Sequence, residues 1–429
     1  MLAYHAVLLA LLVGTTALST VLSILNVRHG AREMWDHEEW LAERLDIQDP
    51  REVIDYARAT TGLSLLQSWV SLVLLLGALY TGVITAAVDV LHDTGLHPAI
   101  QGVAFFLGLL VVQRIVAAPF DLYSTFVVDE QFEFNEQTPR LWVRDQLVGL
   151  LIGVVIVGAL VGALLALVET LATAYWVAGG WLLIVAFMLV MQVVYPRVIA
   201  PLFNDFEPID EGDLRDRVEA VFERAGFEAE EIYTMDASRR SSRLNAYFIG
   251  FGRAKRVVLF DTLVEKLEGP QIEGVLAHEL AHWKRNHVWK RLGAFAVQMG
   301  IVLGVLGYLL STGWLYDLFA LPAEASYVGL FVGLLFVGPL LELSAPLVNR
   351  LSLAHEREAD AFAVDVMGDG EPMVGALSRL AQENLANPFP HPWYAAFNHQ
   401  HPPIPERIRF IESQDESEDD GTAVGASPA

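Results

Sequence analysis

Residues 147–168 read LVGLLIGVVIVGALVGALLALV, an apolar run without a single charged side chain. About 20 residues of apolar helix cross the hydrocarbon core of a bilayer, so this stretch predicts a membrane-spanning helix. Six further stretches have the same character, although the third and seventh along the chain need flanking residues to span. These six are Val7–Val27, Leu63–Val88, Ala99–Val112, Leu171–Tyr195, Leu292–Leu315 and Tyr327–Leu341. The sequence therefore predicts a mainly α-helical, polytopic membrane protein with seven spans.

The composition of the 429 residues agrees with this class and excludes others. Hydrophobic residues make up 54% and charged residues 19%, below the roughly 25% that soluble chains carry. The net charge of −24 argues against a nucleic-acid partner, because an acidic protein repels phosphate. The absence of cysteine excludes disulfides and thiolate metal sites. Abundant Asp and Glu with scarce Lys favour a salt-rich cytosol, and with it a halophilic archaeal source, over the alternative of an ordinary acidic surface.

The loops predict an orientation in the cell membrane. Arginines gather in the loops after the first and third stretches, at positions 28, 32, 44, 51, 58, 114, 140 and 144. The three loops on the other side, His92–His97, Glu169–Thr170 and Tyr316–Ser326, contain no Lys or Arg. Basic residues stay on the cytoplasmic side. We therefore expect the N-terminus outside the cell, and the large polar regions and the C-terminus in the cytoplasm.

These features divide the chain into five parts. The parts are 1–197 with spans one to five, 198–291 as a cytoplasmic domain, 292–348 with spans six and seven, 349–412 as a helix and a Pro-rich loop, and 413–429 as a disordered acidic tail. The first apolar stretch lacks a preceding basic run and a convincing cleavage site, so we interpret it as an anchor. Strand-like runs in the cytoplasmic domain occur at Glu231–Met235, Ala246–Phe251 and Val257–Phe260.

The sequence His278-Glu279-Leu280-Ala281-His282 lies in a helical run and has metal-ligand spacing. Positions four apart on a helix are offset by only about 40°, so the two imidazoles face one side and can bind one Zn²⁺. Glu279 is about 100° away, where it can reach a water molecule on the metal. The motif alone leaves open a helix with two solvent-facing histidines. His287, about 140° beyond His282, is not expected to join the site while the helix continues.

A zinc hydrolase needs a third protein ligand and leaves the fourth position to water. The later helix, at 349–367, offers Glu356, Glu358 and Asp360. Glu356 and Asp360 are four apart and share a face, while Glu358 points away by about 200°. One of the pair can bind the metal while the other orients a ligand histidine. The spacing leaves the order of these roles open, and a solvated acidic face is the alternative.

Several segments, in this order along the chain, carry a resemblance to a known family. They are Phe132–Thr138, Tyr195–Pro196, Ile199–Asn204, Ser241–Phe248, Val258–Leu263, His278–Trp283, Glu356–Asp360, His401–Pro403 and Glu406–Arg407. With them the sequence resembles the integral-membrane CAAX prenyl protease family (type 1), a group of zinc metalloproteases. The resemblance runs from about Pro119 to Ile411. It departs from the family pattern at Glu133, where glycine is usual, and at Arg243 and Leu244, where His and Ser are common. These departures are expected to affect substrate fit and loop packing.

The resemblance implies a fold and a metal site. The fold is seven membrane helices enclosing a water-filled chamber, with a cytoplasmic α+β zinc-metalloprotease domain of gluzincin-like type. The metal is one Zn²⁺ per chain, with His278, His282 and Glu356 as ligands. Asp360 is then the partner that orients a ligand histidine.

The same resemblance implies catalytic and substrate-binding residues. Glu279 is expected to act as general base, and His401 to donate a hydrogen bond to the oxyanion. Asn245, Ala246 and Tyr247 are expected to bind an extended peptide along a strand edge.

The predicted function is therefore a membrane-embedded zinc metalloendopeptidase. The resemblance implies cleavage near the C-terminus of prenylated, CAAX-type substrates, whose lipid rests in an apolar membrane cavity. The alternative is a membrane quality-control protease of broad specificity. A non-catalytic transporter is less favoured, because most span centres lack ionisable residues. The expected partners are a peptide or protein substrate, prenylated or not, and the lipid bilayer. No oligomeric state is indicated.

Overall fold

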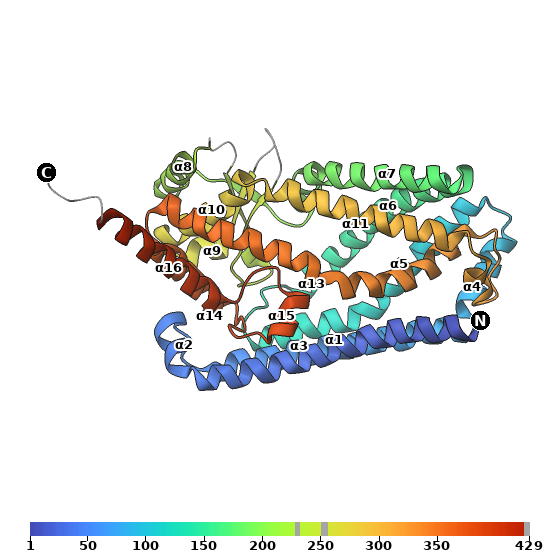
Figure 1. Cartoon of the computed structure of the whole chain (residues 1–429), viewed down its shortest axis with the longest axis horizontal. Coiled ribbons are helices and arrows are strands. Elements are labelled where there is room, and N and C mark those ends of the chain that lie inside the picture. The colour runs from blue at the N-terminus through green and yellow to red at the C-terminus, as the bar shows by residue number, and fades with distance from the viewer. Residues whose placement is uncertain (228–231, 250–255, 424–429) are drawn as a thin grey trace.

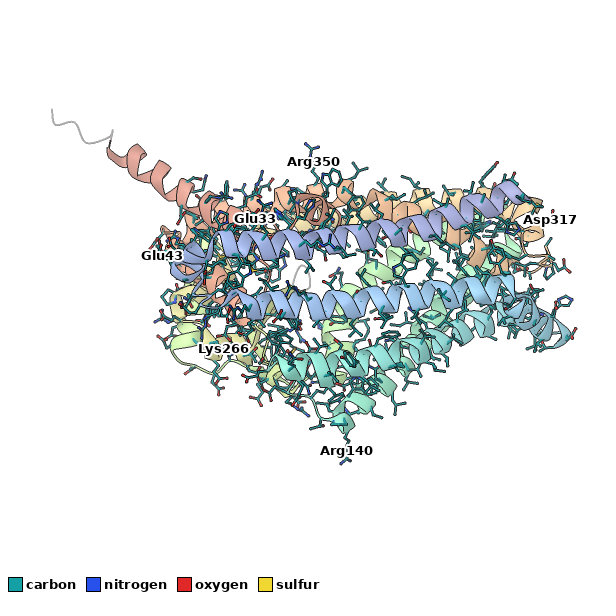
Figure 2. All side chains as sticks on the ribbon, turned by 90° about the horizontal axis from the view of Figure 1, so that it is seen from below. Glu33, Glu43, Arg140, Lys266, Asp317 and Arg350 are labelled. Carbon is teal, nitrogen blue, oxygen red and sulfur yellow. The ribbon has the colours of Figure 1, made fainter. Side chains whose placement is uncertain are left out.

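The computed structural model describes residues 1–227, 232–249 and 256–423. Figure 1 shows long helices that run along the longest axis of the molecule, with the N-terminus at one end and the C-terminus at the other. The sheet and most of the short helices gather at the C-terminal end, whereas α4 (Val83–Asp93) lies at the end that holds the N-terminus. In Figure 2, the labelled Glu43 and Lys266 lie at this end, and Asp317 lies at the opposite one.

The seven predicted spans are confirmed as helices long and apolar enough to cross a membrane. They are α1 (Leu2–Asp36), α3 (Pro50–Tyr80), α5 (Pro98–Tyr123) extended by η1 (Ser124–Asp129), α6 (Pro139–Thr170), α7 (Thr173–Val194) extended by η2 (Tyr195–Ile199) and η3 (Ala200–Leu202), α11 (His287–Leu310), and α13 (Ser326–Met367). Only 6% of the most apolar window is buried in the spans formed by α5, α6 and α7. These helices thus bury little of their surface against the rest of the protein.

Two boundaries differ from the prediction. Leu63–Val88 was expected to form one helix, but α3 ends at Tyr80 and α4 (Val83–Asp93) follows. Gly82 between them has φ 82°, a left-handed conformation that glycine adopts without strain and that a helix cannot continue through. The predicted span ending at Leu341 and the predicted ligand helix beginning at Asn349 are instead one continuous helix, α13. The intervening residues, 342–348, continue the membrane helix directly into the polar domain.

A small mixed sheet forms the centre of the polar domain. Its strands are β1 (Phe206–Pro208), β2 (Ile232–Met235), β3 (Ala246–Ile249) and β4 (Arg256–Phe260), in the order β1-β2-β4-β3. The three predicted strands are thus confirmed within the described residues, whereas Glu231, Gly250 and Phe251 lie outside them. Strand β1 was not predicted, because it has only three residues and contains a proline.

Short helices surround this sheet. They are η4 (Ala237–Arg239), α8 (Asp213–Ala225), α9 (Asp261–Lys266), α10 (Gly269–Lys284), α14 (Glu371–Glu383), α15 (Pro392–Asn398) and α16 (Ile404–Ala423), with α2 (Glu38–Leu45) and α12 (Gly313–Asp317) joining the long helices. Val218 of α8, Leu259 of β4, Leu276 and Leu280 of α10, and Ala363 of α13 are fully buried in one core. Helix α13 therefore belongs to both the membrane part and the polar domain.

The end of the chain also differs from the prediction. A disordered tail was expected from Ser413, but α16 continues as a helix to Ala423. Ile408 and Ile411 are buried against α2 and α14, which anchors the first turns of the helix. Glutamate and glutamine are good helix formers, and a helix extends more easily than it nucleates. Residues 424–429 lie outside the described part of the chain.

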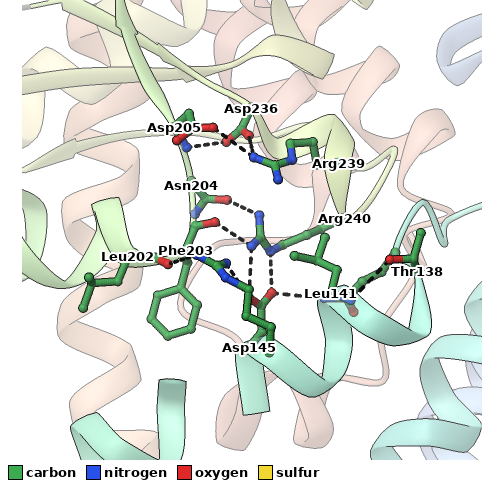
Figure 3. A network of polar contacts seen from close by, with 12 residues as sticks. Thr138, Leu141, Asp145, Leu202, Phe203, Asn204, Asp205, Asp236, Arg239 and Arg240 are labelled. Carbon is green, nitrogen blue, oxygen red and sulfur yellow. Dashed lines mark hydrogen bonds and ion pairs between the residues drawn. The ribbon is translucent and has the colours of Figure 1, made fainter. Parts of the chain in front are cut away.

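An arginine network joins the polar domain to the membrane helices (Figure 3). Arg240, after η4, donates from Nε to Asp145 Oδ2 of α6 at 2.8 Å and from Nη1 to Asn204 Oδ1 at 2.9 Å. Arg239 beside it pairs with Asp205 and Asp236 at 2.9 and 2.8 Å. The segment that leads into β3 is thereby fixed to the polar end of α6.

The departures from the family pattern have structural counterparts. Glu133 has φ 58°, a conformation that glycine adopts more easily, which accounts for the usual glycine. Arg243 donates to Asp129 at 3.0 Å and lies over the ring of Phe134 at 4.6 Å. Leu244 is buried and its N–H donates to Asn384 Oδ1 at 3.0 Å. Arg243 and Leu244 thus fix the loop before β3.

Candidate metal centre

Helix α10 presents the histidine motif because its ends and its buried face are well defined. At its N-terminus Glu268 and Gln271 form a capping box, in which the N–H of Glu268 donates to Gln271 Oε1 at 3.0 Å. Leu276 and Leu280 are completely buried in the core of the polar domain. This packing fixes the rotation of the helix about its axis, so that His278 and His282 face α13.

The two histidines converge on one carboxylate of α13. His278 Nε2 lies 3.3 Å from Glu356 Oε2, and His282 Nε2 lies 3.5 Å from Glu356 Oε1. Bonds of about 2.0–2.1 Å at tetrahedral angles place neighbouring zinc ligands about 3.3 Å apart. Each Nε2 is thus about one such spacing from an oxygen of Glu356, a different oxygen for each histidine. Ligand atoms of His278, Glu279 and His282 also lie within 4.8 Å of one another.

The second nitrogen of His278 has a buried carboxylate partner. His278 Nδ1 lies 2.8 Å from Asp360 Oδ1, and Asp360 accepts two hydrogen bonds from Arg407, at 2.6 and 2.9 Å. Burial and the Arg407 charge oppose protonation of His278, but the carboxylates of Asp360 and Glu356 outweigh them and raise the pKa of His278 to about 9. A metal ion must displace this proton, so binding releases protons. Arg407, which the sequence offered only as part of a family match, is the group that holds Asp360.

The pKa values of the other two motif residues, His282 and Glu279, are shifted in opposite directions. Burial, together with the charge on His278, lowers the pKa of His282 to about 3, so its imidazole is neutral. Burial also raises the pKa of Glu279 above its ordinary value. A raised carboxyl pKa lies closer to neutral pH, which suits a group that accepts and later returns a proton.

His401 lies beside the same carboxylate, from the loop between α15 and α16. Its Nδ1 is 2.6 Å from Glu356 Oε2, while its side chain is 62% exposed. Arg291 of α11 donates to Glu356 Oε1 at 3.3 Å. The structure thus brings His401 to the candidate metal ligands.

His287 and Glu358 were not expected at the site, and the structure places both near it. His287 was not expected at the site as long as the helix that carries His282 continues. In the structure α10 ends at Lys284, and a second helix, α11, begins at His287. His287 contacts His282, and Glu358 contacts His287. Asn286 between the helices was the available signal, since asparagine tolerates the left-handed conformation that ends a helix.

The predicted substrate-binding residues lie at an edge of the sheet. Strand β3 pairs with β4, and among the described residues no strand pairs with its other side. Asn245 is exposed, and its C=O accepts from Phe260 N at 3.2 Å. Ala246 and Tyr247 begin the strand, which contacts α10. An extended peptide can therefore add its backbone along β3 next to the histidine motif.

An apolar cavity of about 500 Å³ lies between α6, α7 and α11. Its lining consists of Leu160, Ile184, Phe187, Met188, Met191, Gln192, Tyr195 and Phe295. Phe295 lies eight residues beyond His287 on α11, about 12 Å along the helix axis. The cavity therefore lies among the apolar helices, and its one lining residue on α11 is about two turns from His287.

Comparison with known proteins identifies the family. Residues 36–205 match the profile described as CAAX prenyl protease N-terminal, five membrane helices, and residues 208–415 match Peptidase family M48. The chain is 36% identical to the CAAX prenyl protease 1 homolog of Arabidopsis thaliana over 77% of this chain and 78% of that protein. It is 31% identical to CAAX prenyl protease 1 of Saccharomyces cerevisiae over 72% of this chain and 71% of that protein.

The fold has a counterpart among solved structures. The crystal structure of S. mikatae Ste24p superposes with a TM-score of 0.83 at 24% identity, covering 95% of this chain and 98% of that one. Both domains, the helical membrane part and the histidine-bearing domain, are thus accounted for by one family over nearly the whole chain. The chain belongs to the CAAX prenyl protease 1 family of M48 peptidases, and it is a multi-pass membrane metalloendopeptidase.

Proposed function

We propose that the protein hydrolyses peptide bonds with one Zn²⁺ per chain, held by His278, His282 and Glu356. The observation that carries this proposal is the placement of both Nε2 atoms at 3.3 and 3.5 Å from one buried carboxylate. Each distance, to a different oxygen of Glu356, is close to the spacing of neighbouring zinc ligands. Asp360 supports it by fixing the tautomer of His278, so that Nε2 is free for the metal.

The chemistry divides between the metal and the chain. When bound, zinc supplies Lewis acidity, which polarises a carbonyl and makes a water molecule more acidic. Glu279 accepts the proton of the attacking water and returns it to the leaving amine. His401, exposed and adjacent to Glu356, turns to donate a hydrogen bond to the oxyanion. Asn245, Ala246 and Tyr247 hold the peptide backbone in extended form beside α10.

The proposed substrates are prenylated proteins cleaved near the C-terminus. The relatives are named CAAX prenyl proteases, and the apolar cavity between α6, α7 and α11 offers an isoprenoid chain a place out of water. Each buried CH₂ group contributes about 0.8 kcal/mol, so a prenyl chain in this cavity adds substantial binding energy. Broad-specificity quality control is not favoured, because no feature of the site calls for it.

A paired assay tests this proposal. The purified protein in lipid nanodiscs is given a farnesylated CAAX peptide and the same peptide without the lipid, and we expect at least tenfold higher kcat/KM for the farnesylated one. Met191→Trp, which narrows the cavity, is expected to reduce this preference. Val190→Trp is the matched control, since Val190 lies on the same helix but is 56% exposed and outside the cavity lining. Equal rates for both peptides contradict the prenyl substrate, and no hydrolysis of either contradicts the peptidase.

We also propose that the end bearing the metal site faces the cytoplasm and the N-terminus faces outward. The bias of basic residues supports this orientation. The two termini lie at opposite ends of the molecule (Figure 1), as an odd number of spans requires. The chain has no cysteine, so a single introduced cysteine is the only thiol that a maleimide can label. In intact cells a membrane-impermeant maleimide should label Asp317→Cys and spare Glu43→Cys, two positions at opposite ends (Figure 2). The reverse pattern contradicts the orientation.

A further inference from the structure

His287, the first residue of α11, is completely buried and turned back toward α10. Asn286 before it has φ 57° and ψ 31°, so the chain changes direction between the two helices. As a result His287 Nδ1 lies 2.9 Å from His282 Nδ1. His287 Nε2 lies 2.9 Å from Glu358 Oε2. A chain of two hydrogen bonds thus runs from a carboxylate of α13 to the histidine of α10.

This chain determines the position of each proton. A histidine that binds a metal through Nε2 carries its proton on Nδ1, which in His282 then donates to His287 Nδ1. His287 must accept there, so its own proton is on Nε2 and donates to the carboxylate of Glu358. Only this arrangement satisfies both contacts with neutral imidazoles. Glu358, which the helical spacing directs away from Glu356, therefore still acts on the metal site.

The surroundings of His287 hold its ring in place. The ring stacks on that of His355, with centroids 4.1 Å apart and planes inclined by 11°. His355 is also buried, and its Nδ1 has no hydrogen-bond partner. The contribution of His355 is thus the flat face of its ring. On the outer side Lys290 Nζ lies 3.8 Å from Glu358 Oε2, which keeps the carboxylate near α11.

We propose that His287 and Glu358 are positioning residues, which hold His282 in the tautomer and rotamer that binds the metal. The inference rests on the proposed zinc function. Each of the two histidines then has an outer partner. Asp360, held by Arg407, orients His278, and Glu358 orients His282 through His287. Outer partners of this kind typically change metal affinity by about 10–100-fold.

Zinc affinity, measured by competition with a chromophoric chelator, tests the proposal without reference to turnover. His287→Phe keeps a ring stacked on His355 but removes both hydrogen bonds, and should weaken zinc binding about 10–100-fold. His355→Phe is the matched control, because it keeps the stack while it removes the two ring nitrogens of His355, of which the buried Nδ1 has no partner. His287→Asn, whose Oδ1 can accept from His282, should recover part of the affinity. The Co²⁺-substituted His287→Phe protein should also show a shifted d–d absorption.

The outcomes separate this inference from the proposed function. Unchanged zinc affinity and an unchanged Co²⁺ spectrum in His287→Phe, with a parent that binds zinc, overturn the inference alone. A parent that binds no zinc overturns both. If His287→Phe does not fold, Glu358→Ala serves instead, because this side chain is half-exposed. It should weaken zinc binding several-fold, and affinity equal to that of the parent contradicts the proposal.

Discussion

Glu279→Gln is expected to retain zinc and to lose peptide hydrolysis by about 10²–10⁴-fold in kcat, the usual contribution of a general base. The glutamine has nearly the same shape but cannot accept the water proton. Because Glu279 is not among the proposed ligands, the metal content should stay at one ion per chain. Single-turnover hydrolysis of a farnesylated peptide, together with elemental analysis of the same sample, measures both quantities.

Two further variants show whether the loss of activity is specific to Glu279. Glu273→Gln lies on the same helix, pairs with Arg217 and Arg224 away from the site, and should keep kcat within about twofold. His401→Gln should lose about 10²–10³-fold, as expected for one donor to an oxyanion. If Glu279→Gln cleaves peptide as fast as the parent, or loses its zinc, the assigned role of Glu279 is wrong.

Glu356→Ala is expected to empty the metal site. Its carboxylate is completely buried and contacts His278, His282, His401 and Arg291. Removing it deletes one of three protein ligands and leaves the neighbouring cations without an anion. The loss of zinc affinity should exceed the roughly 10–100-fold that an outer partner costs, and hydrolysis should fall to background.

The matched control is Asp365→Ala, an exposed carboxylate on the same helix, which should leave zinc content and activity unchanged. Thermal unfolding in detergent distinguishes loss of metal from loss of fold. A folded Glu356→Ala protein with full zinc occupancy would show that another group provides the third ligand.

Much of the fold and the site was predictable from local signals. Apolar length identified all seven spans, and the i, i+4 spacing of His278 and His282 identified two converging imidazoles. The order of Glu356 and Asp360 was not predictable from spacing, because both share a face of α13 and only the approach of α10 decides which lies beside Nε2. In the structure Glu356 lies beside Nε2 and Asp360 beside Nδ1 of His278.

The rest depended on contacts between distant segments. His287 lies nearer the site than helical spacing predicted, because Asn286 adopts a left-handed conformation and the helix that carries His282 does not continue to His287. The approach of His401 to Glu356 depends on how the loop after α15 returns to α13, which no periodic pattern encodes. The continuity of α13 was not predicted because the apolar run ends at Leu341 and Pro346, which lacks an N–H, lies inside the helix.

The most direct test of the account is the zinc content of the purified, folded parent protein, measured by elemental analysis after removal of loosely bound metal. We expect one zinc ion per chain, retained through size-exclusion chromatography and removed by a strong chelator together with peptidase activity. Zinc well below one ion per chain in a sample that cleaves peptides would contradict the claim that His278, His282 and Glu356 hold a catalytic metal.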